Sequence, residues 1–397
     1  MRRNPATLAW AVLLFSFCGC IAIAVGVPSA VQWYVNNATI PRSTVLETIR
    51  GTVLLQRAGD RAEVGVSARQ NLEEGDVVRT TADSQAIVWL FDGSNVRLWN
   101  DSRLALQTVR SSRYTNALTS VSFSLQQGHC RVEVALPSSE SRRMEIVTPT
   151  SVVAMREGSY SIEVRTDEGK VLTEVVTHNG SASVTAMGKT VEVLRAERTE
   201  VAAASAPSDP MPAARNLVTN SDFSQGLEVG WVSDSRAEDG VLPEVVTSTE
   251  DGRVVARFFR NGSRKHGEAF LVQQINRDVT DFESLTLNLE IKLTHQSLSG
   301  GGWLGSEYPM MVRLRYRDIH QSETFWVRGF YYQNDDNHPT SNGLLVPHNT
   351  WYKFAEPLDL FDPAVVTPRP AYIMTIELLA MGWDFESAVT EVQLIAE

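Results

Sequence analysis

The sequence predicts an all-β protein that follows a single N-terminal transmembrane helix, and three observations predict it. About 20 apolar residues follow Arg2 and Arg3 without a charge, which is the length that a helix needs to cross a bilayer. Short runs rich in valine and isoleucine, separated by Gly, Asp and Asn turns, repeat along most of the remaining chain. Neither half of that remainder has a long helical period.

The composition indicates an acidic globular protein. The chain has 397 residues, enough for two ordinary domains of about 100 to 200 residues each. Hydrophobic residues make up 43% and charged residues 21%, which are values typical of chains that bury a core. The formal net charge is −11, so we expect no general attraction for nucleic acid.

The N-terminal segment predicts membrane attachment. We expect a cytoplasmic stretch at 1–5, the anchor with its interfacial segment at 6–35, and a short stalk at 36–43. Because the positive residues precede the helix, the bulk of the chain is expected outside the cytoplasm, as a single-pass cell-membrane protein. A cleaved signal peptide is the alternative, but its apolar region is usually about 7 to 15 residues long. Lipidation at Cys20 is disfavoured, because the apolar run continues beyond it.

The rest of the chain divides by composition. Residues 44–198 read as a first β domain of short strands. Residues 199–215, rich in alanine, proline and serine, are predicted to form a linker. Residues 216–397 return to strand patterns with more aromatic residues and predict a second β domain. Cys130 is the one cysteine outside the anchor, and we expect it to be a small buried apolar residue.

The stretch GDVVRTTADSQAIVWLFDGSNVRLW, from Gly75 to Trp99, contains the two most conspicuous acids of the first domain. Asp76 and Asp92 each lie beside a glycine, so they are either a catalytic carboxylate pair or turn residues. A general acid and base need a shared cleft and different environments, for which the sequence gives no support. We therefore predict that both shape turns.

Two registers are open for the hairpin around Asp92, and a slip of one residue exchanges the buried face. A two-residue loop at Asp92 and Gly93 gives a shared face of Ile87, Trp89, Phe91, Val96 and Leu98. A three-residue loop with Gly93 left-handed gives a shared face of Ala86, Val88, Leu90, Val96 and Leu98. The second face is wholly aliphatic, so we favour that register.

Several motifs in order resemble the FecR-like domain family. They are GDVVRT, AIVWLFDGSNVRL, SRLAL, LQQGHCRVEV, VTPTSVVAMREGSYSIEV and THNGSASV, and the resemblance covers about Thr44 to Arg198. One departure is that Glu157 separates Arg156 from Gly158, which are normally adjacent in the family, so a bulge is expected there.

The resemblance implies an extracytoplasmic β module of the bacterial envelope, where such domains accompany glycan-binding ones. The proteins for which the family is named are transmembrane regulators that pass an outer-membrane transport signal to a cytoplasmic sigma factor. Only about five residues precede the helix here, too few for a folded domain. We therefore do not expect this chain alone to bind a sigma factor.

The second β domain resembles carbohydrate-binding modules and galactose-binding-like jelly rolls. The resemblance rests on NLVTNSDFSQGLEVGWV at its start and EVQLIAE at its end, and covers about Asn216 to Glu397. It implies a β-sandwich that binds glycans. Its strand SLTLNLEIKL alternates strictly, which predicts a half-buried antiparallel strand with leucines at 285, 287, 289 and 293 and Ile291 facing inward.

Two further strands supply the candidate ligand-binding residues. In MVRLRYRD, three arginines alternate with apolar residues, and in TFWVRGFYY, Trp326 and Arg328 share a face. If the two faces coincide on neighbouring strands, rings could stack on sugars while arginines bind hydroxyls or carboxylates. The predicted set is Arg313, Arg315, Arg317, Trp326, Arg328 and Tyr332. The alternative is that the arginines pair with Glu290 and other acids while the aromatics fill the core.

The sequence gives little indication of catalytic, phosphate-binding or metal-binding motifs. There is no GxSxG or HExxH motif, and Gly188, Lys189 and Thr190 read as a turn because Ser183 replaces the first glycine of a phosphate loop. His338, with Asp335 and Asp336, is either a hard-cation ligand group or a polar turn. We predict no catalytic residue, no metal site and no cofactor.

The leading hypothesis is a non-catalytic, membrane-anchored extracytoplasmic protein that binds or organises surface polymer, either polysaccharide or peptidoglycan. The first alternative is a sensory subunit that signals through a membrane partner in the envelope. The second is a glycan-active enzyme built on the distal sandwich, since a carboxylate pair from distant sequence stays open.

Overall fold

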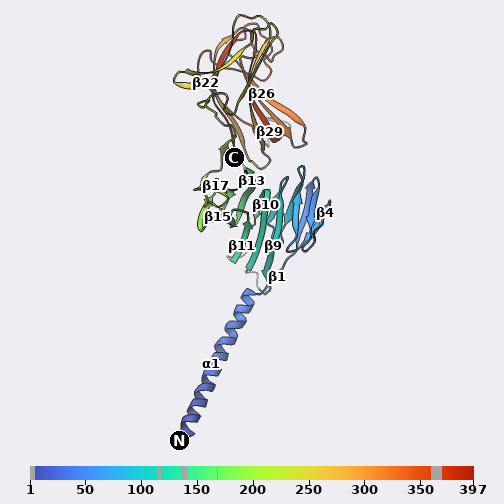
Figure 1. Cartoon of the computed structure of the whole chain (residues 1–397), viewed down its shortest axis with the longest axis vertical. Helices are drawn as coiled ribbons and strands as arrows, with labels where there is room; N and C mark the ends of the chain where they lie inside the picture. Colours follow the sequence, from blue (N-terminus) through green and yellow to red (C-terminus); the bar gives the residue numbers. More distant parts are fainter. Residues whose placement is uncertain (1–4, 115–117, 136–140, 168, 359–368) are drawn as a thin grey trace. The chain divides into compact units, whose positions relative to one another are not determined.

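The protein consists of one N-terminal helix and two β units. The computed structural model describes residues 5–114, 118–135, 141–167, 169–358 and 369–397. Its contacts divide it into Met1–Ala213 and Ala214–Glu397. Figure 1 colours the first unit from blue through green and the second from yellow through red. The predicted all-β class with one N-terminal apolar helix is confirmed.

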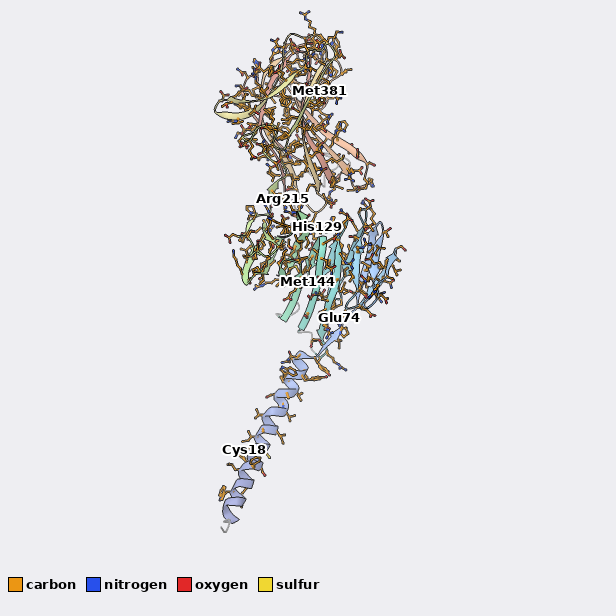
Figure 2. The ribbon with its side chains drawn as sticks, in the orientation of Figure 1. Cys18, Glu74, His129, Met144, Arg215 and Met381 are labelled. Carbon is orange, nitrogen blue, oxygen red and sulfur yellow. The ribbon has the colours of Figure 1, made fainter. Side chains whose placement is uncertain are left out.

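Helix α1 runs from Pro5 to Asn37, a little longer than predicted at both ends. Within it, Leu13–Asn37 is long and apolar enough to cross a membrane, and it is the one such helix in the described part of the chain. The side chain of Cys18 is exposed on this helix (Figure 2). The helix therefore has the length and composition that the sequence predicted for the anchor.

The predicted stalk at 36–43 is wrong as a description of the backbone. Asn36 and Asn37 end the helix, and β1 (Thr39–Pro41) follows after one residue and pairs with β9. The Arg113 N–H also donates to the Ala38 carbonyl at 2.8 Å. Because these backbone groups are bonded to the β unit, the helix joins the first domain without a free polar connection.

The first unit is one hydrogen-bonded network of strands that closes on itself around its own core. Figure 1 shows β9, β10 and β11 side by side; β9 pairs antiparallel to β10, and β11 pairs parallel to it. The long β10 also pairs with β8 and β13 through its last residues. Besides β1, the strands are β2 (Thr44–Arg50), β3 (Val53–Gln56), β4 (Glu63–Val66), β5 (Gln70–Leu72), β6 (Val77–Thr80), β7 (Gln85–Trp89), β8 (Asn95–Leu98), β9 (Arg103–Ser112), β10 (Leu118–Val134), β11 (Ser141–Val147), β12 (Val152–Met155), β13 (Gly158–Asp167), β14 (Lys170–Asn179), β15 (Ser181–Ala186), β16 (Lys189–Leu194), β17 (Glu197–Ala202) and β18 (Met211–Pro212).

The β7–β8 hairpin has the favoured register. Val88 pairs with Val96, and the Leu90 N–H donates to the Ser94 carbonyl, which leaves a three-residue loop that ends at Gly93. Gly93 has φ of 86°, the left-handed conformation that this loop needs. The predicted inward residues are buried, as the exposed fractions confirm: Ala86, Val88, Val96 and Leu98 at 0% and Leu90 at 6%. Trp89 faces outward and donates its indole N–H to Glu47 at 2.9 Å.

A bulge lies close to the position where one was expected, but it is on the partner strand. The pairing of β13 with β14 shifts register between Ser159 and Tyr160. Gly158 itself has φ of 152°. The extra residue in this shift is His178 of β14, because Ser159 and Tyr160 are consecutive while their partners Asn179 and Thr177 are two positions apart. Glu157 precedes β13 and lies outside this ladder, so the bulge does not arise from its insertion.

The segment predicted as a linker, 199–215, is mostly bonded to the first unit. Its first residues form part of β17, which pairs with β14, and Val201 is fully buried. The Thr199 hydroxyl donates to the Ser208 carbonyl at 2.8 Å, and β18 returns to pair with β17. The flexible linker was therefore a wrong prediction, because these hydrogen bonds fix a backbone whose composition alone favours disorder.

The second unit is a β-sandwich. One sheet has the order β21-β22-β30-β24-β28, with β19 paired to β30, and the other has the order β20-β23-β29-β25-β26-β27. Residues of both sheets share one apolar core, and the five alternating residues of β24 from Leu285 to Leu293 are all buried there, as predicted. The strands are β19 (Arg215–Asn216), β20 (Val232–Ala237), β21 (Glu244–Glu250), β22 (Arg253–Arg260), β23 (Gly267–Asp278), β24 (Leu285–Gln296), β25 (Met310–Asp318), β26 (Glu323–Tyr331), β27 (Gly343–Leu345), β28 (Tyr352–Pro357), β29 (Pro370–Gly382) and β30 (Phe385–Ala396).

Candidate functional site: the arginine face of the sandwich

The register between β25 and β26 divides the predicted ligand-binding set between two faces of one sheet. Arg313 pairs with Val327, and Leu314 pairs with Trp326. Residues paired across an antiparallel ladder point to the same face, so Trp326 lies on the side of the buried Leu314. The prediction that the arginines and Trp326 form one platform is therefore wrong, although the alternation within each strand is as expected.

Three of the predicted residues make contacts toward the interior of the sandwich, namely Trp326, Arg328 and Tyr332. Trp326 and Tyr332 are partly buried against the shared core. Arg328 donates to Glu356 of the opposite sheet at 2.6 Å. The Tyr332 hydroxyl accepts the backbone N–H of Gln296 at 3.1 Å, and its ring stacks on His348 with centroids 4.2 Å apart. These contacts hold the two sheets together at one edge.

The three arginines of β25 lie on the outer surface of the same sheet. We define the arginine face as Arg313, Arg315, Arg317, Phe325 and Glu377. The alternate residues Val312, Leu314 and Tyr316 are at most 2% exposed, which confirms the predicted inward side of β25. Tyr316 is buried deeply enough that desolvation raises the pKa of its hydroxyl.

Glu377 of β29 organises this face, and the sequence analysis missed it. Its side chain is only 7% exposed, and it pairs with both Arg313 and Arg315. Arg315 Nε lies 2.8 Å from one carboxylate oxygen, and the Thr375 hydroxyl donates to the same oxygen at 3.0 Å. A single acid within the apolar run YIMTIELLAMG was the available signal, because a buried carboxylate needs charged or polar partners.

The ion pair with Glu377 leaves other N–H groups of the Arg315 guanidinium exposed to solvent. The side chain of Arg315 is 52% exposed, and within the described residues its bonded contact is the one from Nε to Glu377. Arginine carries five N–H donors in a fixed fork, so the terminal nitrogens stay available for an acceptor. Two arginines share one carboxylate, so Arg313, Arg315 and Glu377 together keep one positive charge, and Arg317 adds a second.

Aromatic rings lie beside these guanidinium groups. Phe325 is 55% exposed, and its ring centroid is 5.9 Å from the Arg313 guanidinium carbon. Arg317 lies 4.4 Å from the centroid of Tyr372. Cation–π contacts of this kind restrain a guanidinium over a ring without using its N–H donors. The face therefore combines fixed donors, positive charge and exposed ring surface.

The two acids that raised the question of catalysis act as turn residues. Asp76 is 1% exposed; it pairs with Arg57 at 2.7 Å and accepts the backbone N–H groups of Ala58 and Glu73, each at 3.0 Å. Asp92 accepts the N–H of Ser94 at 2.9 Å. Both predictions of turn chemistry are confirmed, and the carboxylate of Asp76 additionally ties together three segments.

The remaining candidates also have structural roles. The Asn334 side chain makes two hydrogen bonds to the backbone of His338, and the Asp336 N–H donates to the Ser299 hydroxyl. These contacts form the polar turn that was the alternative to a cation site. Lys189 reaches Asp209 and the Pro207 carbonyl, as expected of a turn residue and not of a phosphate loop. Cys130 is buried, as predicted. Within the described residues, no group of three potential metal ligands comes together.

Comparisons with known proteins identify one region by family. Residues 76–183 match the family model described as FecR protein. No curated protein matched. Among solved structures, the chain is similar to a candidate anti-sigma factor from Parabacteroides distasonis, with 16% identity, a TM-score of 0.28, and coverage of 38% of this chain and 70% of that one.

Two further solved structures are similar to part of this chain. A family 11 carbohydrate-binding module of a cellulosomal cellulase from Clostridium thermocellum has 13% identity, a TM-score of 0.29, and coverage of 46% of this chain and 95% of that one. The enzymatically active domain of tailspike protein 4 from bacteriophage CBA120 has 13% identity, a TM-score of 0.31, and coverage of 46% and 21%. The family match falls inside the stretch whose motifs predicted it, so residues 76–183 are a FecR domain, which this chain carries between an N-terminal apolar helix and a β-sandwich.

Proposed function

We propose that this protein is a non-catalytic, membrane-anchored protein of the cell envelope whose sandwich binds an acidic surface polymer at the arginine face. The observation that carries the proposal is the Glu377 carboxylate, which holds Arg313 and Arg315 beside exposed Phe325. A uronic acid unit offers a carboxylate for the guanidinium groups and an apolar ring face for the phenyl group. Polysaccharides that contain uronic acids present this chemistry on the sugar ring, whereas peptidoglycan presents its carboxylates on its peptide stems.

The charge order around α1 supports placement of the β units outside the cytoplasm. Arg2 and Arg3 precede the apolar span, and positive flanks stay in the cytoplasm. The predicted boundaries of the cytoplasmic stretch, the anchor and the two β domains belong to this proposal. In this arrangement both β units face the envelope space, where surface polymers lie.

The binding test uses the full chain in nanodiscs of zwitterionic lipid. Titration calorimetry with hexagalacturonate should detect binding, and the fully methyl-esterified hexamer should bind more weakly because its carboxylates are masked. Arg315→Ala should weaken binding about tenfold, which corresponds to about 1.4 kcal/mol. Arg264→Ala, an exposed arginine outside the face, is the matched control.

Three results would count against the proposal. They are no binding of any uronate oligomer, equal affinity for the esterified form, and equal loss in the Arg315 and Arg264 variants. Release of new reducing ends from the hexamer would instead support the glycan-active enzyme.

A second function, a regulatory subunit that signals through a membrane partner, is favoured by the FecR domain together with the apolar helix. Here the helix would contact another transmembrane segment. Replacing residues 1–42 by an unrelated single-span anchor should then abolish co-purification of a specific membrane protein while the ectodomain stays folded. Identical co-purification with both anchors would contradict this function.

A further inference from the structure

The sheet opposite the arginine face has a groove in its own outer surface. Its volume is about 400 Å³, and it crosses β28, β24 and β30. The residues of one row are paired across the ladder: Ala355 of β28 with Asn288 of β24, and Asn288 with Gln393 of β30. Because Ala355 carries only a methyl group between longer neighbours, the edge strand leaves room above the backbone.

A bulge in β30 shapes one wall of the groove. The pairing with β24 shifts register between Asn288 and Glu290, opposite Gln393 and Thr390. Glu391, within this shift, has φ of 51°, a left-handed conformation uncommon for a residue with a side chain. Bulges redirect a side chain out of the regular ladder, and Glu391 is an exposed lining residue. The backbone is thus irregular at the groove, in a strand that is otherwise central to the sheet.

Ion pairs fix the other wall. Glu290 pairs with Arg253, which reaches across β30, and with Lys353 of β28 at 3.1 Å. Burial raises the pKa of the Glu290 carboxyl, but the hydrogen bonds from Lys353 and Arg253 outweigh burial and lower it. Glu290 therefore stays ionised near neutral pH and remains an acidic partner for both cations.

The indole ring of Trp351 packs against Arg253 of this wall. Trp351 donates its N–H to Asp251 at 2.9 Å, and the Arg253 guanidinium carbon lies 5.1 Å from the ring centroid. The Lys292 ammonium nitrogen lies 5.9 Å from the same centroid and 3.1 Å from an Asp251 carboxylate oxygen. These contacts immobilise a large ring beside the groove before any ligand arrives.

The side chains that line the groove carry no net formal charge. Two cations and two carboxylates line the groove, so their formal charges cancel. Asn288 and Gln393 supply amide groups, each of which is both a donor and an acceptor. A row of donors and acceptors without net charge matches vicinal hydroxyl groups, which both donate and accept.

We propose that this groove is a second glycan-binding site, which takes an uncharged oligosaccharide. Its chemistry differs from that of the arginine face, which has positive charge. The outer surfaces of the two sheets of a sandwich face away from each other. One domain would then hold an acidic and a neutral polymer at once, and this bridging, unlike the groove itself, rests on the proposed function.

The test uses full-length protein in nanodiscs and three neutral hexasaccharides as probes: cellohexaose, xylohexaose and mannohexaose. Titration calorimetry should detect binding of at least one of them. Ala355→Leu fills the groove and should lower that affinity at least tenfold, and Gln393→Ala removes a hydrogen-bonding wall and should lower it several-fold. Arg315→Ala, on the opposite sheet, should leave it unchanged.

Each variant is checked by thermal unfolding and by its binding of hexagalacturonate. If Ala355→Leu does not fold, Gln393→Ala and Glu391→Gln, which alter exposed side chains, carry the test. Failure of all three neutral probes to bind at millimolar concentration overturns the inference. Loss of neutral binding in Arg315→Ala with full binding in Gln393→Ala also overturns it, since there would be one site. Neutral binding without hexagalacturonate binding overturns only the proposed function.

Discussion

In the first β unit the polar groups of Tyr160 and Asp76 bond the protein's own backbone, whereas in the second unit Arg313 and Arg315 lie on an open sheet face. The Tyr160 side chain is fully buried; its hydroxyl donates to the Ser181 carbonyl at 2.9 Å and accepts the Ser181 N–H at 3.2 Å. Burial raises the pKa of this hydroxyl, so it stays protonated and keeps its donor.

This contrast distinguishes polar side chains that stabilise the fold from polar side chains that can bind a ligand. A buried polar group that bonds the backbone of neighbouring segments holds a turn, and its loss should cost stability. A charged group that is fixed on one side and open on the other can bind something else. Glu74, labelled in Figure 2, illustrates the intermediate case. Hydrogen bonds from Arg110 and from the Val109 N–H lower the pKa of its carboxyl and join a loop to β9.

The largest effect is expected from Gly180→Ala in the first unit. A Cβ at this position would lie 2.2 Å from the Glu157 carbonyl and 2.6 Å from the Tyr160 hydroxyl, at φ of 87°. Backbone strain and overpacking should together cost about 3 to 5 kcal/mol in the free energy of unfolding. Gly188→Ala, at φ of 76° with no atom within 4 Å, is the control and should cost about 1 to 2 kcal/mol. Urea unfolding measures both, and equal costs would contradict the steric argument.

The second effect is that of Asp76→Ala, which removes a buried carboxylate from two backbone N–H groups and from Arg57. We expect a loss of about 2 to 4 kcal/mol in the free energy of unfolding, since Arg57 regains water but the amides do not. Asp92→Ala, at the hairpin tip, should lose about 1 kcal/mol or less. Thermal unfolding of both variants checks this, and a greater loss for Asp92 would reverse the assignment of the key turn.

The third change, Glu377→Ala, tests whether the second unit keeps structural and binding roles apart. It leaves Arg313, 20% exposed, without its acidic partner, and we expect a loss of about 1 to 3 kcal/mol in the free energy of unfolding. Hexagalacturonate affinity should also fall, because neither guanidinium is then positioned. Unchanged affinity in a folded variant would show that the carboxylate does not organise the binding face.

The smallest effect concerns pH. His266 bonds Glu307 at 2.7 Å and Glu268 at 3.0 Å. Burial lowers the pKa of the imidazole, but the hydrogen bonds that it donates to both carboxylates outweigh burial and raise it above the usual 6.5. Its stabilisation is therefore complete below pH 6.5 and is lost as pH rises through the raised pKa.

Differential scanning calorimetry at pH 6 and pH 8 measures this contribution. The melting temperature of the wild type should fall more between the two pH values than that of His266→Gln. An equal fall in both proteins would show that His266 does not contribute, and the comparison holds all other titrating groups constant.

Much of the local structure follows from the sequence because it depends on near neighbours. Alternation within β24 and β25 predicts which side chains are buried, since successive residues of a strand point to opposite faces. The DGS tip predicts the β7–β8 register, because Gly93 permits the left-handed conformation that a three-residue loop requires. The apolar run predicts α1, and the ordered motifs predict the FecR domain.

The tertiary structure alone decided which strand faces coincide and where the chain is bonded. Alternation orders residues along one strand but does not relate two strands, so the placement of Trp326 opposite the arginines needed the β25–β26 pairing. Composition suggested a linker at 199–215, but hydrogen bonds to β14 and Ser208 hold it. Glu377 became the centre of the candidate site only because β29 lies beside β25. Sequence thus determines local periodicity and turn chemistry, while contacts between distant segments depend on the pairing of whole strands.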